Sequence, residues 1–143
     1  MWRLRNYLLL LTVLFTFILL GCNENLNDEN SHYYYSNNNN FPAVGNTANA
    51  FAFAVTANNF SFSEKYPVTF NSNSVVLGLT VTNFGRGNGR LDFINSGDSV
   101  YYSVPLRSNI AYGNKEVTGG TPKWIEIELS NFTGQLSIGV AAN

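Results

Sequence analysis

Apolar and polar residues alternate with a period of two along most of residues 41–143, as expected for strands with one buried face. Turn-forming residues interrupt the alternation about every eight to twelve positions. No stretch of this region has the 3.6-residue period of an amphipathic helix. The predicted strands lie in residues 51–55, 60–62, 66–70, 75–82, 91–93, 100–106, 125–129 and 136–140. The pattern therefore predicts a small all-β domain of seven or eight short antiparallel strands.

Segments rich in glycine and asparagine are the predicted turns. Residues 85–89 contain three glycines and are expected to form a hairpin loop, because glycine readily adopts positive φ. Further turns are expected at 58–59, 96–98, 119–122 and 131–134. Pro67 indicates a position at a sheet edge, and residues 110–112 are expected to be short and irregular. These turns predict a β-sandwich, with a partly closed barrel as the alternative.

The N-terminal residues follow a different pattern. Arg3 and Arg5 precede an almost wholly apolar run, residues 7–20, and Gly21 stands before the only cysteine, Cys22. A basic start, a short apolar core and a small residue before the cleavage point are typical of a secretory signal peptide. The run is shorter than the roughly 20 apolar residues that span a bilayer. An uncleaved single-span anchor is the alternative.

The tetrad Leu19-Leu20-Gly21-Cys22 resembles the lipobox of bacterial lipoproteins. The resemblance implies cleavage between Gly21 and Cys22, lipidation of the Cys22 thiol and acylation of the new amino terminus. Two or more acyl chains hold a protein stably on a lipid bilayer. The expected organisation is a signal peptide at 1–21, a lipidated cysteine with a flexible linker at 22–40, and a β-sandwich domain at 41–143. The expected location is the cell envelope, favouring the outer membrane or cell surface over the inner membrane.

Residues 23–40 consist mainly of asparagine, serine and acidic residues, a composition that cannot bury enough apolar surface to fold. This predicts a flexible linker. Glu24, Asp28 and Glu29 resemble the acidic signal that sends some lipoproteins of the Bacteroidetes type to the cell surface, although a solvated spacer is the favoured interpretation. The only histidine, His32, stands before a run of three tyrosines, and an incidental role is expected for it.

Charge and residue types narrow the function. The chain has 8 basic and 9 acidic residues, and loss of Arg3 and Arg5 with the signal peptide would leave 6 and 9, which argues against a nucleic-acid partner. Residues 41–143 contain no histidine or cysteine, so nucleophilic triads and zinc sites are not expected there. Asp92, Asn95 and Asp98 could bind calcium, but a role in forming a turn is favoured. No cofactor, metal or catalytic residue is assigned, and the protein is not expected to be an enzyme.

One group of side chains suggests a ligand site. Glu126 and Glu128 share a strand face and lie about 7 Å apart, a separation used by inverting glycosidases, but their alternation with buried isoleucines predicts a solvent-exposed face. Trp124 shares that face, and Tyr101 is expected to point outward. An exposed tryptophan among carboxylates can stack on sugars, but a structural role is favoured for Trp124, which would cover a sheet edge or pack under the 113–122 loop.

The leading hypothesis is a non-catalytic lipoprotein that binds an envelope protein or has a structural role. The first alternative is a carbohydrate-binding module that uses Trp124, Tyr101, Glu126 and Glu128 to hold a polysaccharide. The pattern of strands and hairpins broadly resembles that of small carbohydrate-binding and adhesive modules of exported bacterial proteins, without a diagnostic motif. A second alternative is a protein that self-associates through its exposed edge strands.

Overall fold

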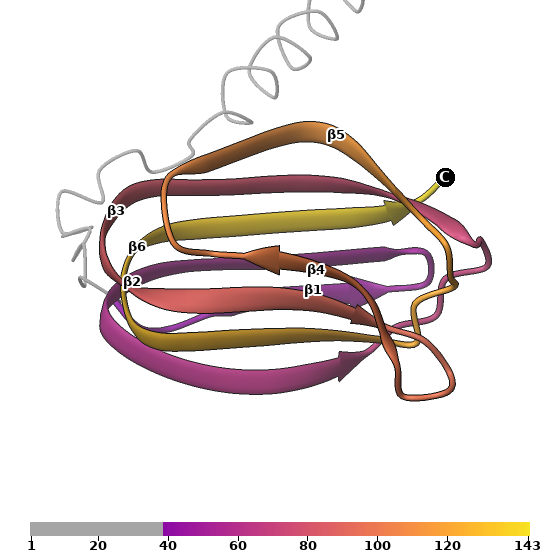
Figure 1. The fold of residues 1–143 in the computed structure, drawn as a ribbon, viewed down its shortest axis with the longest axis horizontal. Helices are drawn as coiled ribbons and strands as arrows, with labels where there is room; N and C mark the ends of the chain where they lie inside the picture. The colour runs from indigo at the N-terminus through magenta and orange to yellow at the C-terminus, as the bar shows by residue number, and fades with distance from the viewer. Residues whose placement is uncertain (1–38) are drawn as a thin grey trace, which may run out of the picture. The chain divides into compact units, whose positions relative to one another are not determined.

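The computed structural model describes residues 39–143, which form an all-β antiparallel fold (Figure 1). Its six strands hydrogen-bond in one sheet, in the order β1-β2-β6-β3-β4, with β5 also paired to β3. The strands are β1 (Ala43–Thr47), β2 (Ala50–Pro67), β3 (Ser74–Ile94), β4 (Val100–Pro105), β5 (Ile110–Thr118) and β6 (Trp124–Ala142). The predicted signal peptide, Cys22 and almost all of the linker lie outside the described residues. In the described part of the chain, no helix is long and apolar enough to cross a membrane.

Three long strands, β2, β3 and β6, carry the sheet through a bend that folds it back on itself (Figure 1). Phe51 and Tyr66 lie near opposite ends of β2, yet their ring centroids are 5.3 Å apart. The backbone of Asn49, just before β2, also donates to the carbonyl of Thr69, just after it, at 3.2 Å. The sheet is therefore doubled, and its two halves face each other.

We call these halves the first and second layers. The first layer contains β1, β5 and residues 50–57, 74–82 and 134–142 of the long strands. The second layer contains β4 and residues 60–67, 88–94 and 124–132. Each long strand passes from one layer to the other without reversing direction, so the same backbone ladder connects both.

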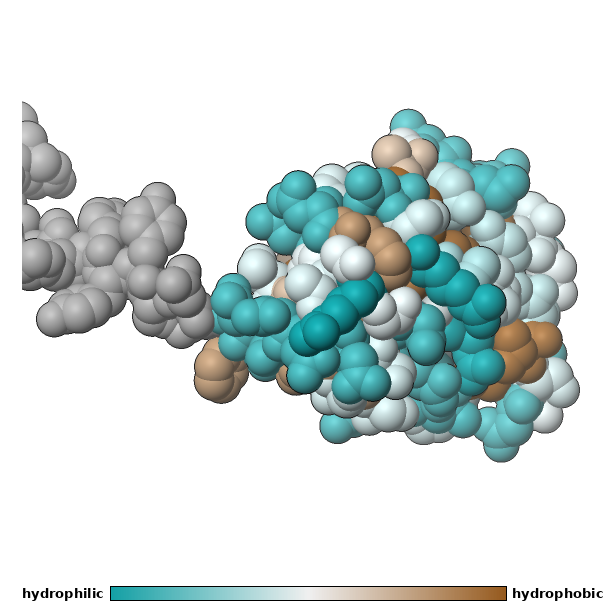
Figure 2. Space-filling view, turned by 60° about the vertical axis from the view of Figure 1, so that its left-hand side comes forward, coloured by the Kyte–Doolittle hydropathy of each residue, from teal (hydrophilic) through white to brown (hydrophobic). Residues whose placement is uncertain are grey.

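The bend passes through all three long strands at irregularities in their pairing. The register shifts between Ala57 and Phe62 of β2, and between Thr82 and Asn88 of β3. Non-glycine residues with positive φ occur at each crossing: Asn59 (51°), Asn83 (52°) and Asn131 (48°). Asparagine tolerates this conformation better than most residues. Figure 2 brings this end of the domain forward and shows a mainly hydrophilic surface with separate hydrophobic spots.

Three predicted turns are therefore wrong. Residues 85–89 lie inside β3, residues 58–59 inside β2 and residues 131–134 inside β6. Glycine and asparagine with positive φ serve equally well in a hairpin and in a β-bulge, which bends a strand without ending it. Seven predicted strands consequently overlap only three observed ones, since β2 also takes in the first residues of the predicted strand 66–70. The expected sandwich of seven or eight strands is replaced by six strands in one doubled sheet. The all-β antiparallel class is confirmed.

Other predicted details can also be compared with the structure. Residues 96–98 and 119–122 lie between strands, as expected for turns. Residues 110–112, expected to be irregular, begin the nine-residue strand β5. Pro67 lies in the part of β2 that β1 does not reach, since β1 pairs only with the first five residues of β2. Within the described residues, the expected edge position of Pro67 is therefore confirmed.

The core lies between the two layers and is built by the alternation seen in the sequence. The inward residues of β2, β3 and β6 form one continuous cluster with Val104, Leu106 and Val117. Its largest fully buried members are Phe51, Phe53, Leu77, Leu79, Leu91, Phe93, Leu106, Ile125, Ile127, Phe132 and Leu136. Burying each such side chain contributes about 1.5–3 kcal/mol before chain entropy is counted. The outward residues of both layers are left free for other roles.

Candidate functional site

The outward side of the second layer carries the candidate site, which we call the polar face. We define it by Lys65 of β2, Arg90 and Asp92 of β3, Ser103 of β4, and Trp124, Glu126 and Glu128 of β6. Trp124, Glu126 and Glu128 are partly exposed, whereas the residues that alternate with them, Ile125, Ile127 and Leu129, are buried. The predicted shared outward orientation of these three residues is therefore confirmed.

Strand pairing arranges these side chains in rows across the sheet. Glu126 lies in register between Lys65 on β2 and Asp92 on β3. Glu128 lies in register with Arg90 on β3. Directly opposed residues on one sheet face are close enough for their side chains to interact, so acids and bases form one charged patch.

An ion-pair network crosses β3, β4 and β6. Asp92 is only 2% exposed, and its Oδ2 accepts from Arg90 Nε at 2.6 Å. Ser103 Oγ donates to Asp92 Oδ1 at 2.5 Å. Arg90 Nη2 also reaches Glu128 Oε2, at 3.1 Å. Arg90 therefore joins a buried carboxylate to an exposed one, which holds the polar face in one arrangement.

Trp124 lies beside a cation. Lys65 Nζ is 5.0 Å from the centroid of the Trp124 ring, within the range of a cation–π interaction. The same ammonium group lies 3.2 Å from Asp98 Oδ1. A ligand that stacks on Trp124 must therefore use the part of the ring that Lys65 leaves open, or displace Lys65.

Glu126 is the carboxylate of this face that has fewest partners. Within residues 39–143, its side chain makes neither a hydrogen bond nor an ion pair, whereas Asp92 and Glu128 both contact Arg90. Its register neighbour Asp92 is also acidic, and like charges directly opposed across two strands repel. A ligand group that donates hydrogen bonds would relieve this arrangement, so Glu126 is the natural acceptor for such a group.

Tyr101 does not point outward as the sequence predicted. In the pairing of β3 with β4, Phe93 lies opposite Tyr102 and Ile94 opposite Val100, so Tyr101 is the extra residue of a bulge. Its ring packs edge-on to buried Phe93, with centroids 6.4 Å apart, and its hydroxyl is buried without a hydrogen-bond partner among residues 39–143. Burial raises the pKa of Tyr101 to about 12. Tyr101 thus packs with the core instead of presenting its ring on the polar face.

The oxygen ligands considered for calcium have structural partners instead. Asn95 Oδ1 accepts from the backbone of Gly97 at 2.9 Å and of Ser99 at 3.1 Å, which closes the turn between β3 and β4. Asp98 is paired with Lys65 and Asp92 with Arg90. In the part of the chain that the structure describes, no three histidine, cysteine, aspartate or glutamate side chains are grouped so as to hold a metal ion.

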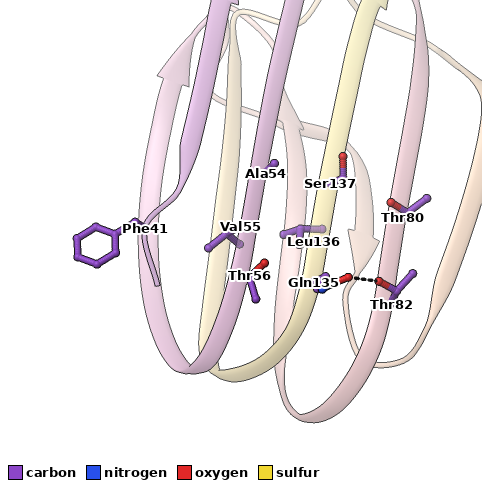
Figure 3. Close-up of a pocket in the computed structure, with 9 residues that line it drawn as sticks. All are labelled: Phe41, Ala54, Val55, Thr56, Thr80, Thr82, Gln135, Leu136 and Ser137. Atoms are coloured by element: carbon purple, nitrogen blue, oxygen red, sulfur yellow. Dashed lines mark hydrogen bonds between the residues drawn. The ribbon is translucent and has the colours of Figure 1, made fainter. Parts of the chain in front are cut away.

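Two hollows were not predicted from the sequence. One, of about 300 Å³, adjoins the polar face and is lined in part by Arg90, Arg107, Asn88 and Glu128. The other, of about 470 Å³, lies on the outward side of the first layer (Figure 3). The second hollow could have been predicted from the small size of the outward residues of β2 and β6. The alternation of apolar and polar residues does not take side-chain size into account.

The polar face offers a cation, an aromatic ring and, at Glu126, a carboxylate that no other described side chain pairs with, all within one small area. These groups can bind a polar ligand through hydrogen bonds and stacking. No protein-family model matches the chain, and a search of the curated proteins finds no similar sequence, so the site is interpreted from its own geometry.

Proposed function

We propose that this protein is a lipid-anchored component of a bacterial cell envelope, with a sandwich-like β domain that acts as a non-catalytic binding module. The anchor is supported by the resemblance of Leu19-Leu20-Gly21-Cys22 to a lipobox, after a basic start and a short apolar run. The acidic residues Glu24, Asp28 and Glu29 support a location at the outer membrane or cell surface.

Acylation tests the anchor directly. The full chain would be produced in a bacterium that processes lipoproteins and is fed an alkyne-bearing fatty acid. The wild-type chain should take up the label and lose its first 21 residues, whereas Cys22→Ser should take up no label and keep its leader. A labelled Cys22→Ser chain, or an unlabelled wild-type chain, would remove the anchor from the proposal.

The polar face is proposed as the binding surface. The observation that carries this proposal is the alignment of Trp124, Glu126 and Glu128 on the outward side of β6, with Glu126 left without a partner within residues 39–143. The Arg90–Asp92–Ser103 network holds the neighbouring strands in place, so a ligand would meet a preformed surface. An envelope protein or a polysaccharide could supply the donors that Glu126 lacks.

A polysaccharide ligand is the second candidate, favoured by the partly exposed Trp124 beside Glu126. Sugar hydroxyls donate hydrogen bonds to carboxylates, and pyranose rings stack on indole. Titration of the processed chain with soluble polysaccharides should give a saturable shift in tryptophan fluorescence, because Trp124 is its only tryptophan once Trp2 leaves with the signal peptide.

Two variants make that titration specific. Binding measured by calorimetry should weaken at least tenfold in Trp124→Ala and should be unchanged in Tyr112→Ala. Tyr112 is a suitable control because it is also an exposed aromatic residue, but it lies on β5 in the first layer. Equal losses in both variants, or no binding by any polysaccharide tested, would leave an envelope protein as the ligand of the polar face.

A further inference from the structure

The outward side of the first layer is unlike the polar face. Its three central strands present only uncharged side chains no larger than glutamine, and we call this surface the small-residue face. Its positions are Ala50, Ala52, Ala54 and Thr56 of β2; Gln135, Ser137, Gly139 and Ala141 of β6; and Val76, Gly78, Thr80 and Thr82 of β3. A sheet face that meets only water usually carries long polar or charged residues. The small-residue face is therefore suited to contact with another surface.

A hollow of about 470 Å³ is cut into this face, lined chiefly by Thr56, Thr80, Thr82, Gln135 and Ser137. Thr82 Oγ1 donates to Gln135 Oε1 at 3.0 Å, so these two lining groups satisfy each other. What remains is a neutral, open hollow lined by methyl, hydroxyl and amide groups, against which a large apolar side chain from another surface can pack.

An aromatic side chain stands at the rim of the same hollow. Phe41 is 73% exposed, the largest value among the large hydrophobic residues exposed in residues 39–143. In Figure 3, Phe41 points away from the other residues that line the hollow. It precedes β1, whose Ala43 pairs with Ala54 of the small-residue face. The phenyl ring therefore projects from this face without filling the hollow beside it.

We propose that the small-residue face binds a second copy of this chain, with Phe41 of each copy seated in the hollow of the other. A projection and a hollow on one face are self-complementary under a two-fold axis, so a single symmetric contact fills both. The three central strands of this face carry no charge that must lose its hydration, and their small side chains let two sheets approach to about 10 Å. Charge enters only at the edge strand β5, where Glu116 lies in register with Val76 and already accepts from Ser74 Oγ at 2.8 Å.

The size of the face is compatible with a reversible dimer. With the edge strands β1 and β5 included, the outward side of the first layer has five strands spaced about 4.8 Å apart. At about eight residues per strand and 3.3 Å per residue they give roughly 600 Å² per copy. Two copies would bury about 1,200 Å², near the lower end of specific interfaces. The proposed contact joins sheet faces, so it differs from pairing through edge strands and leaves the polar face free for its own ligand.

Photo-crosslinking in cells that produce the full chain tests this contact. The substitution Phe41→p-benzoylphenylalanine keeps an aromatic ring at the rim and makes it reactive on irradiation. The expected product has twice the mass of the chain, contains both of two differently tagged copies, and is linked to peptides that include residues 80–82 or 135–137. The control Val100→p-benzoylphenylalanine, at a residue 50% exposed on β4, should give at least tenfold less dimer.

A charge placed in the hollow provides the second arm. Adding Thr80→Lys to the photo-reactive chain should reduce the crosslinked dimer at least fivefold, whereas Ser63→Lys, on the second layer, should not change it. Both positions are exposed, so the domain should tolerate either lysine. The proposal is overturned if position 41 links only within its own chain or to other proteins. It is also overturned if positions 41 and 100 give equal dimer, or if Thr80→Lys has no effect.

Discussion

Tyr101 places a hydroxyl group where no hydrogen-bond partner from the described residues, 39–143, reaches it. A buried hydroxyl without a hydrogen bond costs about 1–3 kcal/mol, because its bond to water is lost on folding and not replaced. We expect Tyr101→Phe to raise the free energy of unfolding by about 1 kcal/mol, measured by urea denaturation at pH 7. The control Tyr112→Phe, at an exposed ring, should change little. A destabilised Tyr101→Phe chain would mean that the hydroxyl has a partner after all.

The same residue gives a pH dependence. Burial raises the pKa of Tyr101 from its ordinary value of 10.0 to about 12, so the folded chain keeps a proton that the unfolded chain loses above pH 10. Below pH 10 the ionisation of Tyr101 does not affect the free energy of unfolding, and as the pH rises from 10 toward 12 that free energy falls, because only the unfolded chain ionises readily. Between pH 10 and 12, thermal unfolding should show a larger fall in melting temperature for the wild type than for Tyr101→Phe. If the melting temperatures of the wild type and of Tyr101→Phe fall equally between pH 10 and 12, the raised pKa of Tyr101 is contradicted.

Asp92 is the residue whose charge the polar face depends on most. Asp92→Asn would leave Arg90 without its closest carboxylate, and we expect a loss of about 1–3 kcal/mol in urea denaturation, because the carboxylate is buried while Arg90 is half exposed. Glu128→Gln removes the exposed partner of Arg90 and should cost under about 1 kcal/mol. Equal losses in both variants would show that burial of Asp92 adds nothing to its pairing.

For single residues, the sequence predicts which way a side chain faces better than it predicts which other side chains it contacts. Alternation along one strand is local, so it correctly predicts that Trp124, Glu126 and Glu128 face outward. The partners of Asp92 come from β3 and β4, and they are brought together only by pairing that alternation does not specify. Tyr101 was mispredicted because a bulge adds one residue and reverses the expected face.

The bend is the feature that decides the length of the strands. Gly87 has φ of +90°, and a Cβ at this position would lie 2.4 Å from the Asn131 carbonyl oxygen. Gly87→Ala should therefore destabilise the domain by at least 2–3 kcal/mol, from roughly 1–3 kcal/mol of backbone strain plus the clash, as measured by chemical denaturation. Gly113→Ala is the matched control, since a Cβ there meets nothing within 4 Å. A bend that tolerates Gly87→Ala would mean that β3 and β6 can separate locally at little cost.

Local sequence could not distinguish these bends from turns. Residues 85–89 have the composition of a hairpin loop, and a hairpin there would pair the two halves of β3 with each other. In the structure, both halves pair with β6 instead. The difference depends on which distant strand is available, so it is a property of the whole sheet. Six long and short strands arise where the sequence predicted seven or eight short ones.

The long strands should make the two layers of the domain unfold together. Since β2, β3 and β6 each run through both layers, unfolding of one layer disturbs strands whose other halves are paired in the second layer. Both layers also contribute to one core cluster. We therefore expect one two-state transition for the domain instead of separate transitions for the layers.

Trp124 makes this expectation testable, because it reports only on the second layer. In a Trp2→Phe background, Leu79→Ala removes a fully buried side chain from the first layer and should cost about 2–5 kcal/mol. If the layers unfold together, the urea midpoint should fall equally by Trp124 fluorescence and by far-ultraviolet circular dichroism. Ile127→Ala in the second layer should shift both signals in the same way. Fluorescence that stays at the wild-type midpoint in Leu79→Ala would show that the bend separates two independently stable layers, and that the continuous strands do not couple them.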